Sequence, residues 1–171
     1  MEINLKGKKA IVLSSTRGLG FSCVEELLFS GAEVTLHGTK EKSINDAISM
    51  LRKKDKKGIF SENIKSIVGN LYNSDDTNRI KKYISSEKPD FLIINSGGPQ
   101  AGGFKDLSVS ELKKESDMII SSALLFMKAA LEPMVEKSYG KIINISSIGL
   151  NLPIPTLAAS NGPRSYLHGL M

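Results

Sequence analysis

Short apolar runs rich in β-branched residues alternate along the chain with longer segments whose apolar residues recur at helical spacing. This alternation is typical of βαβ units and of a parallel sheet. The apolar runs predict five strands, at residues 10–13, 34–37, 64–68, 91–94 and 142–145. The run 91–94 is apolar at every position, as expected of a strand buried on both faces. We therefore expect the fourth and first strands to be the inner ones.

The segments that follow the first three strands predict helices. Their apolar residues at helical spacing are Leu19, Cys23, Val24, Leu27 and Leu28, then Ile44, Ala47, Ile48 and Leu51, then Ile80 and Ile84. Gly31 follows the first helix where a left-handed cap is expected. Ser74 is the expected N-cap of the third.

A fourth, longer helix is predicted to open with the capping box of Ser108 and Glu111 and to run toward Val135. Pro133 lies within it as a candidate kink. A fifth helix is expected at the end of the chain. Pro163 should occupy its first turn, where the missing amide hydrogen is tolerated.

Length and composition limit the class of protein. A chain of 171 residues with 40% hydrophobic composition can bury one sizeable core, so we expect a single domain over residues 1–171. A charged share of 24% is ordinary for a globular protein. The single cysteine, Cys23, fits a reducing compartment, and we expect a cytoplasmic protein. The sequence lacks a run of about 18 uninterrupted apolar residues, so neither a signal peptide nor a membrane span is expected.

The net charge of +5 is concentrated in the basic run 52–57. Such a run is most often a solvated helix end, and an anionic partner such as nucleic acid is the alternative. Aromatic residues do not interleave with these charges, which disfavours nucleic acid. The spacing of Cys, His and carboxylate residues does not resemble a metal site.

A candidate phosphate loop follows the first strand directly and opens the first helix. Small residues there let backbone amides approach a diphosphate, and the helix N-terminus favours an anion. The strand before and the helix after supply the context that such a loop requires. The residues expected to contact a cofactor in this loop are Ser14, Ser15, Thr16, Arg17, Gly18, Leu19 and Gly20.

With this loop the sequence resembles the short-chain dehydrogenase/reductase family, whose loop Thr-Gly-x-x-x-Gly-x-Gly aligns with residues 13–20. Gly18 and Gly20 match the second and third glycines, whereas Ser14 replaces the first, which makes the tight turn. The resemblance extends over nearly the whole chain. It implies a Rossmann-type α/β fold, a doubly wound parallel sheet with helices on both faces.

Two further loops carry the resemblance. Asn70 and Leu71 stand where the family has an Asp-hydrophobic pair that contacts adenine. Asn95, Ser96 and Gly97 follow the fourth strand, where the family's Asn-Asn-Ala-Gly lines the cofactor cleft. The resemblance implies cofactor contacts at all five residues.

The end of the second strand indicates which cofactor is preferred. NAD enzymes of this fold place a carboxylate there to bind the ribose hydroxyls. This chain has Gly38 instead, followed by Thr39 and Lys40, and Arg17 lies in the phosphate loop. These residues can hold a 2′-phosphate, so NADP(H) is expected. His37, just before, is expected to be structural.

The resemblance implies hydride transfer between the nicotinamide and a carbonyl or alcohol, with a Tyr as general acid/base, a Ser, a Lys and an Asn. Ser147 aligns with the serine, but Ser160 stands at the tyrosine position and Arg164 at the lysine position. Ile119 stands at the asparagine position, with Ser121 and Ser122 close by. Serine is a far weaker acid than tyrosine, whereas an arginine can still hold ribose hydroxyls.

The segment from Ser160 to Arg164 and a Gly-Gly-Pro loop resemble a divergent branch related to 3-oxoacyl-[acyl-carrier-protein] reductases. We therefore expect an NADP(H)-dependent oxidoreductase, with a nucleotide-binding protein lacking turnover as the alternative and nucleic-acid binding as a remote third. Tyr166 could replace the missing acid only if its helix turns it inward. By resemblance, the fourth and fifth helices would pair between subunits in a homodimer or homotetramer. The chain stops where family members continue, and it looks truncated beside them.

Overall fold

A five-stranded parallel sheet forms the centre of the computed structural model, which describes residues 3–56, 58, 60 and 62–171. Its strands are β1 (Lys9–Val12), β2 (Glu33–Gly38), β3 (Ile64–Val68), β4 (Phe91–Ile94) and β5 (Lys141–Asn144). They lie in the order β3-β2-β1-β4-β5, and each neighbouring pair is parallel. All five predicted strands are confirmed, and β1 and β4 are inner strands together with β2.

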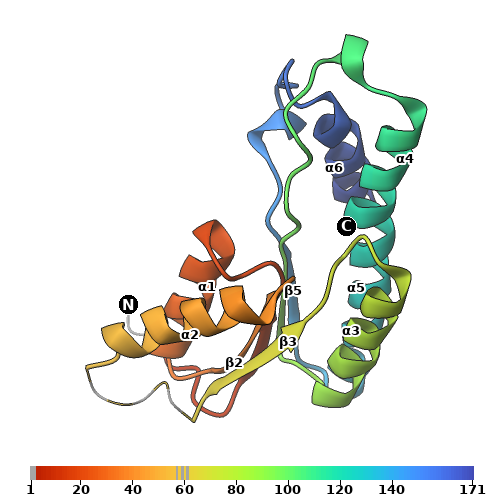
Figure 1. Cartoon of the computed structure of the whole chain (residues 1–171). Helices are drawn as coiled ribbons and strands as arrows, with labels where there is room; N and C mark the ends of the chain where they lie inside the picture. Colours follow the sequence, from red (N-terminus) through yellow and green to blue (C-terminus); the bar gives the residue numbers. More distant parts are fainter. Residues whose placement is uncertain (1–2, 57, 59, 61) are drawn as a thin grey trace.

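Helices cover both faces of the sheet (Figure 1). The first three are α1 (Gly18–Phe29), α2 (Glu41–Lys54) and α3 (Ser74–Glu87), and the last three are α4 (Val109–Ser116), α5 (Ser122–Glu136) and α6 (Ala158–Leu170). Side chains of α1 and α2 pack on one face around Val12 and Leu36, whereas α3 and α5 pack on the other around Ile11 and Leu92. This arrangement confirms the doubly wound Rossmann-type fold.

The helix ends agree with the sequence in two places and differ in two. Gly31 has φ +90° after α1, and Ser108 forms the predicted capping box with Glu111 before α4. The N-cap of α3 is Asn73 rather than Ser74, because the Asn73 side chain accepts the Asp76 amide. Pro163 is the sixth residue of α6, not part of its first turn, so the prediction of its position was wrong.

The predicted fourth helix contains a π-helical turn, Asp117–Ser121, that separates α4 from α5. The Ser122 amide donates to the Asp117 carbonyl, five residues back, whereas the amides of an α-helix bond to the carbonyl four residues back.

The helical span Val109–Glu136 is long and apolar enough to cross a membrane by length and composition. The search for uninterrupted apolar runs in the sequence did not find this span, because polar residues interrupt it. Half of the most apolar 18-residue stretch of this span is buried inside the protein, as expected of a core helix.

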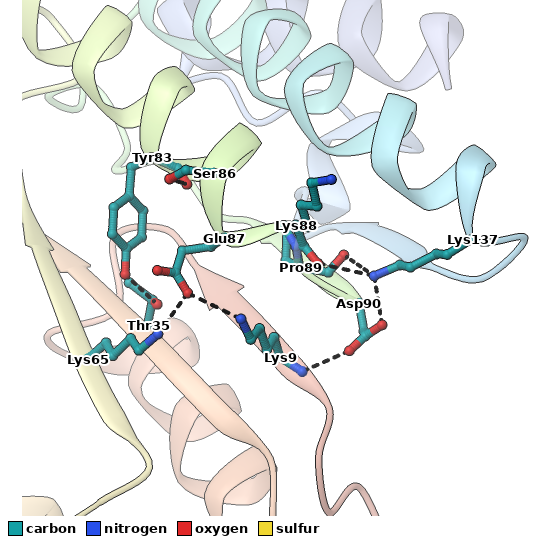
Figure 2. Close-up of polar contacts among 10 residues, drawn as sticks. All are labelled: Lys9, Thr35, Lys65, Tyr83, Ser86, Glu87, Lys88, Pro89, Asp90 and Lys137. Carbon is teal, nitrogen blue, oxygen red and sulfur yellow. Dashed lines mark hydrogen bonds and ion pairs between the residues drawn. The ribbon is translucent and has the colours of Figure 1, made fainter.

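Hydrogen bonds and ion pairs join side chains at the amino end of the sheet (Figure 2). The Asp90 carboxylate accepts the Lys9 amide at 2.9 Å and the Lys137 ammonium at 2.7 Å. Burial raises the pKa of Asp90, but these bonds outweigh it and hold the pKa below its usual value. Glu87 receives the ammonium groups of Lys65 at 2.8 Å and Lys9 at 3.8 Å. This end of the sheet is therefore occupied by internal ion pairs, and the opposite end is the place for a ligand.

The basic run lies at the end of α2. Lys54 binds Glu25 of α1 at 2.6 Å, and Arg52, Lys53 and Lys56 are exposed. Lys57 lies outside the described residues. The described part of the run is thus a solvated helix end tied to the neighbouring helix.

Candidate functional site

The carboxyl ends of β1, β2, β3, β4 and β5 point to the same end of the molecule, where their following loops gather (Figure 1). The chain turns to opposite faces on the two sides of β1, which makes the switch point at which such folds bind ligands. The loops that leave β4 and β5 also run side by side, since the Gly102 amide donates to the Thr156 carbonyl at 2.7 Å. The predicted site residues lie in these loops, at the end of β2 and in the helices α1 and α6 that follow the loops.

The turn after β1 is held by bonds to β2. Ser14 takes a left-handed φ of +46°, and its amide donates to Nδ1 of His37 at 2.9 Å. The Ser15 amide donates to the His37 carbonyl at 2.8 Å. The buried Ser15 hydroxyl donates to the Val12 carbonyl at 2.7 Å and accepts the His37 amide at 3.0 Å. Ser14 and Ser15 therefore use their amides to shape the loop, and the free donors come after them.

Those donors lie at the start of α1. The amides of Gly18, Leu19 and Gly20 belong to the first helical turn and have no intrahelical acceptor. Arg17 precedes them in an extended conformation without capping through its side chain, and Leu19 is 69% exposed. Amides that point out of a helix N-terminus form a favourable place for a phosphate group.

Gly20 allows the loops after β1 and β4 to approach closely. A Cβ at this position would lie 2.7 Å from the Ser14 oxygen, 2.8 Å from Nδ2 of Asn95 and 2.9 Å from the Ser15 Cα. The Asn95 amide group itself donates to the Ser14 carbonyl at 3.0 Å. Asn95 thus joins the two loops, and Gly20 is required where they meet.

The end of β2 is buried up to Gly38 and exposed from Thr39 onward. A Cβ on Gly38 would lie 2.5 Å from Cγ2 of Thr16, so Thr16 covers the strand end with its methyl group. Thr39, the N-cap residue Lys40 and Arg17 are exposed. Their side chains are free of the hydrophobic core and can reach a ligand.

The two residues of the loop after β3 that were predicted to contact a cofactor, Asn70 and Leu71, differ in their exposure. Leu71 is buried at 7% exposure and belongs to the core, whereas Asn70 is exposed. The Asn70 side-chain oxygen accepts the Tyr72 amide at 3.1 Å, and the Asn70 amide donates to Asp76 at 2.8 Å. Of this pair, only Asn70 presents polar side-chain atoms at the surface.

Two cavities flank this loop. One of about 480 Å³ lies between the 98–107 segment and α4, and another of about 610 Å³ lies between the start of α3 and the α4–α5 helix. Tyr72 lines both, and its hydroxyl donates to Glu115 at 2.8 Å. Burial and then this bond raise the pKa of Tyr72 to about 12, so it stays neutral. Residues of the phosphate loop line neither cavity, so both cavities lie to the side of that loop.

Two of the three predicted catalytic positions, Ser160 and Arg164, are bonded to each other in α6, and Ser147 lies on the loop after β5. The Ser147 hydroxyl accepts the Gly149 amide at 3.0 Å. A Cβ on Gly149 would lie 3.3 Å from that hydroxyl and 2.7 Å from the Asn161 side-chain oxygen, so Ser147 faces the start of α6. Ser160 is 5% exposed, and its hydroxyl accepts Nε of Arg164 at 2.8 Å.

Arg164 also joins the loops that leave β4 and β5. Its two terminal nitrogens each lie 3.4 Å from a carbonyl oxygen, one of Ile145 and one of Gly97. Ser96 precedes Gly97 in the loop after β4, with Ser96 half-buried and Gly97 exposed. Burial lowers the pKa of Arg164 from its usual value, yet an arginine remains charged at any working pH. The site therefore holds a permanent cation whose partners here are neutral oxygens.

Replacing Arg164 with Met should lower the free energy of unfolding by about 1–3 kcal/mol, because the acceptors around it lose their charged donor. Chemical denaturation of the unliganded protein measures this. Arg164→Lys, which keeps the charge but fewer donors, should recover part of the loss. A Met variant as stable as the parent would show that the bonds of Arg164 to Ser160, Ile145 and Gly97 contribute nothing to stability.

Of the other candidate positions, Ile119, Ser122 and Tyr166 do not bring a free polar group to this point, whereas Ser121 is exposed and lines the cavity of about 610 Å³. Ile119 lies in the π-helical turn and is 1% exposed, while the Ser122 hydroxyl beside it donates to the Met118 carbonyl. Tyr166 is 61% exposed, so the α6 helix does not turn it inward. Within the described residues, groups of three or more His, Cys, Asp or Glu that could hold a metal do not occur.

Sequence reasoning missed two residues that shape the site. His37 was expected to be structural, and it is buried with internal bonds, but the sequence did not show that one of them holds the phosphate loop. The Asn161 amide group donates to the Ile154 carbonyl at 2.8 Å and so holds the loop before α6. A histidine one residue before the end of a buried strand, at the carboxyl edge, was the signal available for the first.

Comparison with known proteins assigns the family. A family model described as short chain dehydrogenase matches residues 8–160. The 3-oxoacyl-[acyl-carrier-protein] reductase FabG of Aquifex aeolicus is 27% identical over 153 residues, which are 86% of this chain and 58% of the relative. This chain thus spans somewhat more than half the length of that relative.

Comparison with solved structures shows the same fold in other proteins. An NADP-bound 3-oxoacyl (acyl-carrier-protein) reductase from Agrobacterium tumefaciens C58 superposes with a TM-score of 0.87 at 23% identity, over 98% of this chain and 63% of that one. An NADPH-bound short chain oxidoreductase from Pseudomonas aeruginosa PAO1, described as containing an atypical catalytic center, gives 0.84 at 19% identity, over 98% and 65%. These structures share the fold. With the family match over most of its length, the chain belongs to the short-chain dehydrogenases.

Proposed function

We propose that the protein is an NADP(H)-dependent oxidoreductase that transfers hydride to or from a small carbonyl or alcohol substrate. The close approach at Gly20 carries the proposal, because a side chain there would collide with the loops after β1 and β4 that meet beside the start of α1. The first-turn amides of α1 suit the diphosphate of a dinucleotide. Thr16, Arg17, Gly18, Leu19 and Gly20 would line it from one side, and Asn95, Ser96 and Gly97 from the other.

The preference for NADP(H) rests on the end of β2. Thr16 leaves no room for a carboxylate at Gly38, since even a Cβ would lie 2.5 Å from the Thr16 methyl. The exposed side chains of Arg17, Thr39 and Lys40 offer cations and a hydroxyl to a 2′-phosphate. Asn70, with Leu71 behind it, would border the adenine. The NADP and NADPH in the two similar structures support this choice.

Replacing Arg17 or Lys40 with Ala should weaken NADPH binding about tenfold each, with little effect on NADH, because only NADPH carries the extra phosphate. Fluorescence titration with both cofactors measures this. Lys53→Ala, an exposed lysine at the far end of α2, is the matched control and should change neither. Equal losses for NADH and NADPH would contradict a 2′-phosphate site.

We propose the catalytic roles from the family resemblance, and the contacts of these residues are consistent with them. When bound, the nicotinamide supplies or accepts the hydride. Ser147 would orient the substrate oxygen, and Arg164 would hold the ribose hydroxyls. Ser160, buried and bonded to Arg164, would support that arginine and serve poorly as a proton donor. We therefore expect the protein to bind its cofactor but to turn over substrate slowly.

A nucleotide-binding protein without turnover is the second candidate, favoured by the buried Ser160. Loss of reduced-nicotinamide absorbance with a panel of small ketones and 3-oxoacyl thioesters separates the two. Oxidation of NADPH supports the enzyme, whereas binding without oxidation by any member of the panel supports the alternative. Retention on DNA that falls steeply with salt would instead point to the basic run.

We also propose a cytoplasmic homodimer or homotetramer that pairs through α5 and α6. Apolar side chains lie exposed on both helices, among them Leu131 and Val135 on α5 and Leu170 on α6. Exposed apolar side chains on surface helices are typical of an interface between subunits. The single cysteine supports a reducing compartment.

A further inference from the structure

His37 lies at the point where three strand-end loops meet. It is the second-last residue of β2 and is 0% exposed. One ring nitrogen contacts the loop after β1, the other contacts the loop after β3, and the histidine backbone pairs with Ser15. The single side chain of His37 thus contacts the loops that follow the two strands on either side of β2.

The hydrogen bonds define how the ring is protonated. The Ser14 amide can only donate, so Nδ1 of His37 is the acceptor of the 2.9 Å bond. The Gly69 carbonyl can only accept, so Nε2 carries the hydrogen of the 3.0 Å bond. Both bonds are made by the neutral ring. Asp76 and Arg79 of α3 are the charged groups whose fields reach it, and they act in opposite directions.

Ser14 is the residue that needs this support. It holds φ +46°, in the left-handed region that favours glycine, at the position of the family's first glycine. Its part-buried amide would lose its acceptor without Nδ1 of His37. Its carbonyl is held from the other side by Asn95 at 3.0 Å.

We propose that His37 is a positioning residue for the cofactor, which fixes Ser14 in the left-handed turn and thereby aims the amides of Gly18 to Gly20 at the diphosphate. In this chain the histidine supplies, through a hydrogen bond, what glycine supplies through conformational freedom. The cofactor part of the proposal rests on the proposed function. The part that concerns the turn rests on the geometry alone.

Two substitutions separate the ring nitrogens. In His37→Asn the side-chain oxygen falls near the place of Nδ1 and can accept the Ser14 amide. In His37→Gln the side-chain nitrogen falls near the place of Nε2 and can donate to Gly69. We expect His37→Asn to keep NADPH affinity within about threefold and His37→Gln to weaken it about tenfold or more. Fluorescence titration with NADPH gives both values.

Ser14→Gly provides the rescue. Glycine adopts positive φ without strain, so adding Ser14→Gly to His37→Gln should restore most of the lost affinity. The same cycle is measured on unliganded protein by thermal unfolding, where coupling between the two positions is expected as well. Equal losses in the Asn and Gln variants, or a Gln variant that Ser14→Gly does not improve, would overturn the proposal and leave His37 as core packing.

Two outcomes distinguish this inference from the proposed function. If the parent chain does not bind NADPH, the proposed function fails, and the unfolding cycle still decides whether His37 holds Ser14. If His37→Gln does not fold, hydrogen exchange at the Ser14 amide in His37→Asn decides it. Protection equal to the parent supports the bond, and free exchange overturns it.

Discussion

Gly20→Val is expected to abolish NADP(H) binding, with a loss of at least ~100-fold, or about 3 kcal/mol. The first atom of the new side chain would lie 2.7 Å from the Ser14 oxygen and 2.9 Å from the Ser15 Cα. Both are backbone atoms of a turn that is tied to β2, so neither can swing aside. Either the loop after β1 or that after β4 must move, and the cradle for the diphosphate opens.

Isothermal calorimetry with NADPH measures this loss, and circular dichroism checks that the variant is folded. Gly169→Ala is the matched control, because a Cβ at Gly169 in α6 meets nothing within 4 Å. It should bind NADPH like the parent. A folded Gly20→Val protein with unchanged affinity would rule out a phosphate site at this helix start.

The free energy of unfolding is expected to fall by about 3 kcal/mol as pH drops from 6.5 to about 4, through His37 alone. Burial lowers the pKa of His37 to about 4, and the bond to Gly69 and the charge of Asp76 only partly oppose this shift. In the unfolded chain the imidazole takes up a proton near pH 6.5, whereas the folded protein keeps it neutral until about pH 4. The unfolded state therefore gains protons first and is favoured throughout this window.

Urea denaturation at a series of pH values measures this dependence. The pKa of Asp76 is lowered by bonds from the Asn70 amide and from Arg79, so the stability it contributes is lost at lower pH, as the carboxylate is protonated. His37→Asn, which does not titrate, is the control and should flatten the profile between pH 6.5 and about 4. A parent and variant with parallel profiles would show that His37 is not held neutral by the fold.

The sheet could be predicted because its signals are local. Each strand is a short apolar run, as in the segment around Leu92, and each helix repeats at its own spacing. The capping box at Ser108 is likewise contained in four residues. The π-helical turn could not be predicted, since its residues are compatible with an ordinary α-helix and tertiary packing decides between them.

The site was predictable where a residue acts through its own backbone position, as at Gly20 and Gly38. It was not predictable where partners lie far apart in sequence. His37 is 23 residues from Ser14 and 32 from Gly69, and only the fold brings them together. Arg164 was expected to replace a lysine, but its contacts to the Ile145 and Gly97 carbonyls depend on loops 19 and 67 residues away.

The wide turn Asp117–Ser121 also determines how insertions and deletions would act on the molecule. One additional residue in a helical turn rotates everything beyond it by about 100°, so α4 and α5 present different sides to their surroundings. α4 contacts α6, whereas α5 contacts α3 and β4. Loss of a single residue from this turn would rotate α4 relative to α5, so that the contacts of one of the two helices would be lost. The number of residues in this segment, more than their identity, keeps α4 against α6 and α5 against α3.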